Sequence, residues 1–235
     1  MIARQGSENS WIKTNMRLRF LGVFIFTIFL SVSAFATAQY PDKIFYDGKE
    51  YDLLSNPMEL YFQKNPGRKP QTEMKSTALW RGYVASFEIK DGELLLKDVR
   101  IMVDPSTNKK DYERGWKSVL SDVVPDGKPL KIDWFAGLLV LPYGKLVNYV
   151  HMGYASTYEN YILLEIAAGD FKKAKQFGHE EYSAFKDRQF EAFKKTDEYK
   201  KIVEDLKKNR NNSDEFIESF LKSFVTNYTS KFLVD

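Results

Sequence analysis

The side chains that could carry acid–base chemistry in this chain are few. The sequence has no cysteine, which excludes thiol nucleophiles and thiolate metal sites, and its two histidines are His151 and His179. His151 is the better candidate for a general acid or base, because imidazole titrates near neutral pH. Its carboxylate partner would be Asp133, Glu159 or Glu165, at a separation that depends on the fold. The competing interpretation is a half-buried structural histidine.

Residues 143–165 are rich in groups that suit recognition of a sugar or a peptide. Tyrosines offer ring faces for stacking and hydroxyl groups for direction, and loops on a rigid sheet often carry binding groups. Tyrosine also suits half-buried strands, so a structural role is the competing interpretation. The binding candidates in this segment are Tyr143, Tyr149, Tyr154, Tyr158 and Tyr161.

Trp80 and Arg81 form a second pair of binding candidates. An arginine can hold a carboxylate or phosphate through two parallel hydrogen bonds, or stack on an aromatic ring. The glycine that follows, Gly82, indicates a bulge or a close backbone approach. The alternative is a structural tryptophan covered by the arginine side chain.

The chain lacks the sequence signatures of common catalytic and cofactor sites. It contains no G-x-S-x-G, H-E-x-x-H, G-x-G-x-x-G or phosphate-loop motif. Two histidines without cysteine are a poor ligand set for a transition metal. We therefore expect no metal and no cofactor, and we favour a non-enzymatic protein over an enzyme.

The N-terminal residues follow the order of a secretory signal peptide. Two arginines precede the apolar run Phe20–Leu30, and small residues lead to Ala38, after which we expect cleavage. Residues 1–38 are thus interpreted as a signal peptide, with Met16 as the expected start. The alternative is a membrane anchor, although Phe20–Ala36 has 17 residues, the lower end for a span. We therefore expect a periplasmic or secreted protein that has no stable membrane span after cleavage.

The leader also accounts for the net charge of the chain. The formal net charge is +3, and residues 1–38 hold four basic residues and one acidic residue. Residues 39–235 are therefore neutral overall, which gives no general attraction to nucleic acid or anionic lipid. We expect no nucleic-acid partner.

Residues 39–178 have the pattern of consecutive β-hairpins. Turns are predicted at Asp47-Gly48, at Asp91-Gly92 and across residues 168–170, because aspartate and glycine tolerate positive φ. A strand over Lys145–Met152, following a turn at residues 142–144, would carry His151. Asn56 is expected to cap a short helix, and a crossing helix is predicted over Tyr112–Val123.

Residues 179–235 are mainly helical by pattern. Ser213 is expected to cap a helix whose stripe of Phe216, Phe220 and Phe224 predicts packing on the sheet. Strands first and helices after indicate one α+β domain over residues 39–235. We expect its sheet to be antiparallel, with enough strands to curl or close.

Two stretches resemble a group of exported bacterial proteins of unassigned activity. They are STALWRGYVASFEI at Ser76–Ile89 and LVLPYGKLVNYVHMGYASTYENYILLEI at Leu139–Ile166. The resemblance would cover most of residues 39–235. It carries no known catalytic residues, so no activity follows from it.

Two functional hypotheses follow from the sequence. The first is an exported, non-enzymatic binding or interaction protein that recognises an envelope component or a protein partner through residues 143–161. The alternative is a cell-envelope hydrolase that uses His151 with a carboxylate as acid and base. Proximity of His151 to a carboxylate would favour the enzyme, and an aromatic surface without convergent titratable groups would favour binding.

Overall fold

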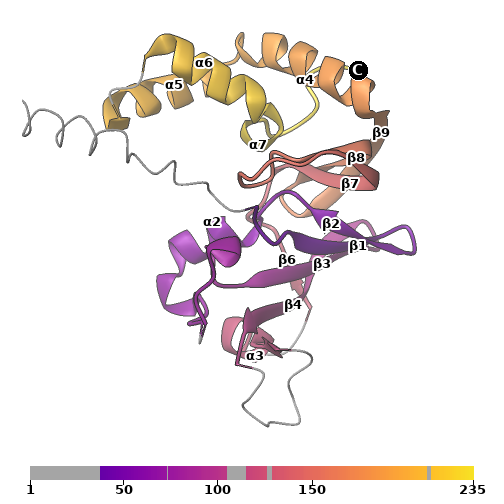
Figure 1. Ribbon diagram of the computed structural model, residues 1–235, viewed down its shortest axis with the longest axis vertical. Coiled ribbons are helices and arrows are strands. Elements are labelled where there is room, and N and C mark those ends of the chain that lie inside the picture. Colours follow the sequence, from indigo (N-terminus) through magenta and orange to yellow (C-terminus); the bar gives the residue numbers. More distant parts are fainter. Residues whose placement is uncertain (1–37, 73, 105–114, 126–128, 211–212) are drawn as a thin grey trace, which may run out of the picture. The chain divides into compact units, whose positions relative to one another are not determined.

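The computed structural model describes residues 38–72, 74–104, 115–125, 129–210 and 213–235 (Figure 1). The expected signal peptide, apart from Ala38, lies outside the described residues. Within them, no helix is both long enough and apolar enough to cross a membrane.

A nine-stranded sheet forms the first part of the fold, with its main path in the order β2-β1-β3-β4-β9-β8-β7. Two short strands, β5 and β6, pair with β4 outside this path. The strands are β1 (Asp42–Tyr46), β2 (Lys49–Leu53), β3 (Val84–Lys90), β4 (Glu93–Met102), β5 (Trp116–Ser118), β6 (Leu130–Lys131), β7 (Gly137–Asn148), β8 (Thr157–Ala167) and β9 (Asp170–Gly178).

The expectation of a purely antiparallel sheet is wrong, because β1 and β3 run parallel, with Ile44 opposite Phe87. The β1–β2 hairpin returns the chain to the end of the sheet where β1 begins. Residues 54–83 begin and finish at that end and pass, through a helix and two 3₁₀ turns, to the other side of β1, so β3 enters the sheet beside β1 in the same direction. The fold is α+β with a mixed sheet.

Helices fill the connection between β2 and β3 and the C-terminal part of the chain. Figure 1 shows α4 to α7 gathered beside β7, β8 and β9, whereas α2 lies by the first strands. The helical elements are α2 (Met58–Lys64), the 3₁₀ turns η1 (Pro66–Arg68) and η2 (Thr77–Leu79), α3 (Leu120–Val123), α4 (His179–Phe193), α5 (Asp197–Arg210), α6 (Asp214–Ser223) and α7 (Val225–Tyr228).

The sheet curls until the two ends of its strand order meet. The backbone N–H of Leu54, next to β2, donates to the carbonyl of Val140 in β7 at 2.9 Å. The Ser55 hydroxyl lies 3.4 Å from both the Leu138 carbonyl and the Val140 N–H. These bonds satisfy backbone groups that an open edge would leave exposed.

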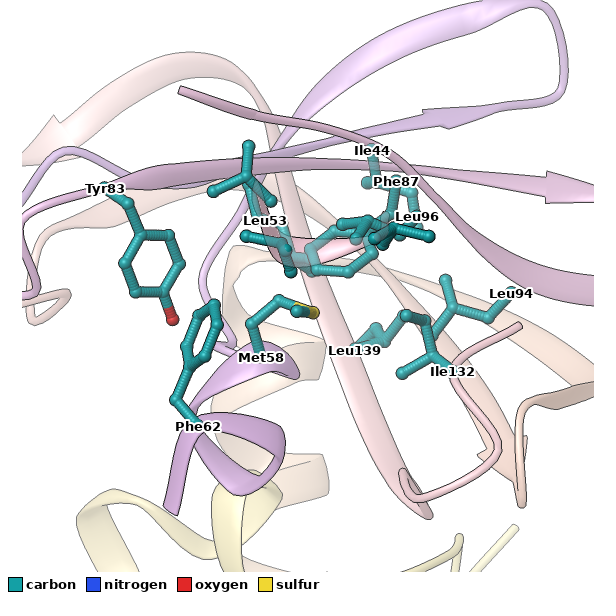
Figure 2. Packing of buried hydrophobic residues seen from close by; sticks show 14 of the residues in the cluster. Ile44, Leu53, Met58, Phe62, Tyr83, Phe87, Leu94, Leu96, Ile132 and Leu139 are labelled. Atoms are coloured by element: carbon teal, nitrogen blue, oxygen red, sulfur yellow. The ribbon is translucent and has the colours of Figure 1, made fainter. Parts of the chain in front are cut away.

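The main core lies inside this curled sheet. Figure 2 shows Ile44, Leu53, Phe87 and Leu96 from the first four strands packed toward Leu139 of β7. Side chains alternate along a strand, so β7 and β8 present a second apolar row on their other face. That row packs against α4, which places β7 and β8 between two apolar layers.

A third cluster joins the C-terminal helices to one another. In α6, Ile217 and Leu221 are buried, whereas Phe216 is 56% exposed and stacks on Phe220. The helix packs chiefly on α4 and α7, and it is α4 and α7 that contact the strands. The prediction that the phenylalanine stripe packs on the sheet is therefore wrong. Ser213 does cap α6, its hydroxyl accepting from the Phe216 N–H.

The hairpin predictions at the three turns are confirmed. Asp47, Asp91 and Ala168 have positive φ values, as these tight turns require. Residues 142–144 are not a turn. They lie within the continuous strand β7, where Gly144 has φ +84° and the register to β8 shifts after Tyr143. The glycine makes a bulge, and a proline is tolerated because β7 ends the strand order.

Two further predictions fail for local reasons. Over Tyr112–Val123, residues 112–114 lie outside the described part, Trp116–Ser118 pairs with β4 as β5, and only Leu120–Val123 is helical. Pairing with a neighbouring strand overrides a weak helical pattern. The side chain of Asn56 does not cap α2 and instead makes tertiary hydrogen bonds.

Candidate functional site

A buried ion pair lies at the start of β1. Asp42 has no exposed surface, and its Oδ2 lies 2.9 Å from Nη1 of Arg81, whose side chain is 10% exposed. The other carboxylate oxygen accepts a hydrogen bond from the Ala85 N–H at 2.8 Å. The carboxylate thus has two donors, which a buried charge requires.

The loops around this pair complete its hydrogen bonds. Arg81 also donates to the side-chain oxygen of Asn56 and to the carbonyl of Tyr40. The hydroxyl of Tyr154 donates to the same Asn56 oxygen at 3.0 Å. The network therefore ties the loop before β8 to β1 and to the residues before α2.

A second part of the network extends from Tyr83. Its hydroxyl donates to Glu59 of α2 at 2.7 Å, and Lys69 lies 3.3 Å from the same carboxylate. The Arg81 guanidinium lies 5.3 Å from the centre of the Tyr83 ring, within range of a cation–π contact. Arg81 thus uses both of its expected capabilities, carboxylate binding and stacking, inside the protein.

Burial shifts the titration of these groups. Burial raises the pKa of Asp42 to about 6, although the positive charge of Arg81 acts in the opposite direction. Burial opposes the charged form of Arg81, but the charge of Asp42, the tyrosines Tyr154 and Tyr83, and the hydrogen bond to Asp42 together outweigh burial and raise the pKa of Arg81. The pKa values of Tyr83 and Tyr154 are also raised, mainly by burial.

The side chains of Trp80 and Arg81 lie in opposite environments, one exposed and the other buried. Ser76 caps η2 by accepting from the Ala78 N–H, and Gly82 follows with φ +83°, so the chain reverses tightly between them. Arg81 enters the buried network, whereas Trp80 is 86% exposed. The structural interpretation of Trp80, with the arginine covering it, is therefore not supported.

Gln39 joins the Trp80 turn to the loop that follows β7. Its side-chain oxygen accepts from the Trp80 N–H at 3.0 Å, its side-chain nitrogen donates to Thr77, and its backbone N–H donates to the Gly153 carbonyl at 3.1 Å. The preceding residue, Ala38, bridges to Gly153. The described chain therefore begins between these two segments.

Several large apolar side chains on these segments are exposed. We call Tyr40, Trp80, Tyr149 and Met152 the N-terminal patch, because they lie on the segments that Gln39 and Tyr40 hold together. Tyr149 and Met152 are each 54% exposed, and Tyr40 is 46% exposed. Leu146 and Val147, at the end of β7 that leads into this loop, are exposed as well.

The other candidate tyrosines have packing partners. Tyr161 is buried and stacks on Tyr182, while its hydroxyl accepts from the Tyr158 N–H at 2.8 Å. Tyr143 lies against the main core, in an edge contact with Tyr51. The structure thus brings Arg81 and Tyr154 together at Asn56 and leaves Trp80 and Tyr149 exposed on neighbouring segments, but it places the remaining three in β7 and β8.

His151 lies outside the strand predicted for it. Strand β7 ends at Asn148, and His151 is an exposed residue in a bend, in edge contact with the ring of Tyr149. The strand stops because the chain turns here through Gly153, where φ is +53°. His151 therefore extends the aromatic character of the N-terminal patch.

The carboxylates considered as partners of His151 serve other contacts. Glu159 accepts from the Lys145 N–H at 2.8 Å across the β7 bulge, and Glu165 accepts from the Phe232 N–H at 2.9 Å. Asp133 is exposed in a turn after β6. Among the described residues, no hydrogen bond or ion pair joins His151 to any of the three.

Metal ligands do not converge in the described part of the chain, where no group of three or more histidine, aspartate or glutamate side chains could hold an ion. His179 begins α4, and its Nδ1 lies 3.1 Å from the Tyr158 carbonyl. Buried side-chain polar atoms of the described residues all have hydrogen-bond partners. The buried polar groups of the Asp42 network therefore hydrogen-bond within the protein, and the network has a structural role.

Sequence reasoning missed Asp42, Asn56 and Gln39. A carboxylate at the start of an amphipathic strand has no signal that distinguishes it from a solvated one, because its arginine partner is 39 positions away. No protein-family model, curated protein or solved structure matches this chain. The site must therefore be interpreted from its own geometry.

Proposed function

We propose that this protein is an exported, non-enzymatic binding protein that contacts an envelope component through the N-terminal patch. The observation that carries the proposal is the exposure of Trp80, at 86%, on a turn fixed by hydrogen bonds. Large exposed aromatics grouped on a rigid surface are typical of interaction sites. Export rests on the signal-peptide pattern of residues 1–38.

Binding is favoured over hydrolysis because the patch lacks convergent titratable groups. His151 is its nearest candidate acid or base, and no carboxylate among the described residues pairs with it. Asp42 and Arg81 are buried and bond to each other, and Asp42 also accepts a hydrogen bond from the Ala85 N–H. An acid–base mechanism would need two such groups aimed at one point.

A binding experiment on exported material tests the proposal. The full chain is expressed, and the exported product is purified and its N-terminus determined by mass spectrometry, with Gln39 expected. It is then incubated with fractionated cell envelope, beside Trp80→Ser/Tyr149→Ser and the control Phe216→Ala. Phe216 is an aromatic residue on α6, outside the patch, and it is about as exposed as Tyr149.

Retention of at least one envelope fraction by the wild type and the control, with loss in the double variant, supports the proposal. Equal retention of all three proteins, or none by any, contradicts it. Circular dichroism and thermal unfolding confirm that the double variant remains folded. Because both substitutions are at exposed sites, little loss of stability is expected.

A further inference from the structure

We propose that four side chains of β8, β9 and α4 form a peptide-binding site, which the chain's own residues 230–234 fill in this structure. We call these side chains the peptide site: Glu165, Lys175, Phe185 and Gln189. We call residues 230–234 the resident segment. The ligand is a short segment of a partner protein that has the chemistry of the resident segment and displaces it. This inference goes beyond the proposed function, because the peptide site shares no residue with the N-terminal patch.

Gln189 binds the backbone of the resident segment from α4. Its side-chain nitrogen donates to the Lys231 carbonyl at 2.8 Å, and its side-chain oxygen accepts from the Leu233 N–H at 2.9 Å. Gln189 has no exposed surface, and it lies one helical turn from Phe185. An apolar side chain would suffice to pack a helix on a sheet. A buried glutamine that uses both its donor and its acceptor on one segment is instead suited to hold peptide backbone.

Glu165 and Lys175 bind the same backbone from the sheet. Glu165 of β8 accepts from the Phe232 N–H at 2.9 Å, and Lys175 of β9 donates to the Val234 carbonyl at 3.1 Å. Together with the bonds of Gln189, they give each of four successive residues one backbone bond to the peptide site. The resident segment belongs to no helix or strand. In peptide recognition, backbone bonds of this kind supply affinity, and pockets for single side chains supply specificity.

Phe232 supplies the buried side chain of the resident segment. Its ring is 7% exposed and makes an edge contact with Phe185, with ring centres 5.7 Å apart. The ammonium groups of Lys173 and Lys175 lie 5.2 Å and 4.9 Å from the centre of the Phe232 ring, within range of cation–π contacts. The residues on either side of Phe232 are more exposed. The peptide site is therefore selective for one aromatic residue and tolerant of its neighbours.

The resident segment can leave the peptide site without disrupting a helix or a strand, because it belongs to neither. Local openings of this kind cost less free energy than global unfolding. Since the segment is tethered beside the site, it competes with a free peptide at an effective concentration on the order of millimolar. The apparent affinity for a free peptide is therefore reduced to the fraction of molecules in which the site is empty.

A labelled peptide tests the inference. The fluorescent peptide YTSKFLVD, which is residues 228–235, is titrated with the full chain, and fluorescence anisotropy measures binding. We expect Phe232→Ser to bind it at least about tenfold more tightly than the wild type, because the substitution weakens the resident competitor and leaves the peptide site intact. Adding Gln189→Leu to this variant should weaken binding again by at least about tenfold, since two backbone bonds are lost.

Three controls separate peptide binding from a general loosening of the fold. Leu221→Ala removes a buried side chain of α6 outside the peptide site and should bind the peptide no more tightly than the wild type. A peptide that carries Phe232→Ser should bind at least about tenfold more weakly than the original peptide. Trp80→Ser/Tyr149→Ser should bind the peptide like the wild type, so the peptide site and the N-terminal patch are tested independently.

Hydrogen exchange tests release of the resident segment in the wild type, without any substitution. The N–H groups of Phe232 and Leu233 are both bonded to the peptide site. We expect them to exchange at least about a hundredfold faster than the slowest N–H groups of α4, because local opening exposes them. Exchange of these groups only through global unfolding overturns the inference. So does equal affinity of wild type and Phe232→Ser for the peptide, or no peptide binding by either.

Discussion

The carboxylate of Asp42 lies 2.9 Å from the guanidinium of Arg81, and the two groups join the first strand to the turn before the third. The second oxygen of Asp42 accepts from Ala85, in the strand that runs parallel to β1. One buried side chain therefore fixes both the parallel pairing and the turn that exposes Trp80. A substitution in this pair should therefore affect both the strand pairing and the turn.

Arg81→Met should destabilise the protein by about 3 kcal/mol or more, because it leaves the buried Asp42 charge without its partner. Urea denaturation at neutral pH measures the change. The control is Arg68→Met, since Arg68 is exposed and donates a single long bond to the Asp122 carbonyl. It should cost within about 0.5 kcal/mol. A cost below about 1 kcal/mol for Arg81→Met would contradict the assigned role.

The stability of the wild type should contain a pH-dependent component from Asp42. Its folded-state pKa is raised to about 6, above its ordinary value of 3.8, so the folded state binds the proton more tightly. The corresponding stability is fully present below about pH 4 and is lost as the pH rises through about 6. Denaturation of wild type and Asp42→Asn from pH 4 to pH 7 measures it. The stability advantage of the wild type over the variant should shrink as pH rises, and parallel profiles would refute the assignment.

Tyr154→Phe should cost about 1 kcal/mol, because it removes the hydroxyl that donates to Asn56 at 3.0 Å and keeps the ring. The matched change Tyr149→Phe removes a hydroxyl from a half-exposed ring in the patch and should be neutral within about 0.5 kcal/mol. Thermal unfolding compares them. Equal losses of stability in the two variants would show that the Tyr154 hydroxyl does not stabilise the loop before β8.

Gly169→Ala should destabilise the fold more than Gly48→Ala. Both glycines have φ near +75° to +78°, so both substitutions incur the same backbone strain, about 1 kcal/mol. A Cβ at Gly169 would lie 3.0 Å from the backbone of Ile132, whereas one at Gly48 meets nothing within 4 Å. Chemical denaturation of the two variants gives the difference. Equal losses would show that the turn at Gly169 can move away from β6.

Leu221→Ala should cost about 2–5 kcal/mol, as expected for a leucine with no exposed surface. Phe216→Ala on the same helix should cost less than about 1 kcal/mol, because Phe216 is more than half exposed. This ranking reverses what the aromatic stripe of the sequence suggests. A larger loss for Phe216→Ala in denaturant would mean that α6 buries the opposite face.

Local signals in the sequence were sufficient for the tight hairpins and the C-terminal helices. Asp-Gly pairs at residues 47–48 and 91–92 dictate their turns through positive φ, which few other residue pairs tolerate. Ser213 marks the start of α6 because a cap depends on residues three positions apart. In each case the deciding interaction lies within a few residues of chain.

Tertiary structure decided the features that depend on distant residues. The parallel β1–β3 pairing, the closure of β2 onto β7 and the bulge at Gly144 all depend on which strand lies alongside. The candidate site is of the same kind. Trp80 and Arg81 are adjacent with similar sequence signals, yet one is exposed and the other buried, because only Arg81 meets a carboxylate 39 residues away. Burial is a property of the assembled fold, since a side chain loses water only when other segments cover it.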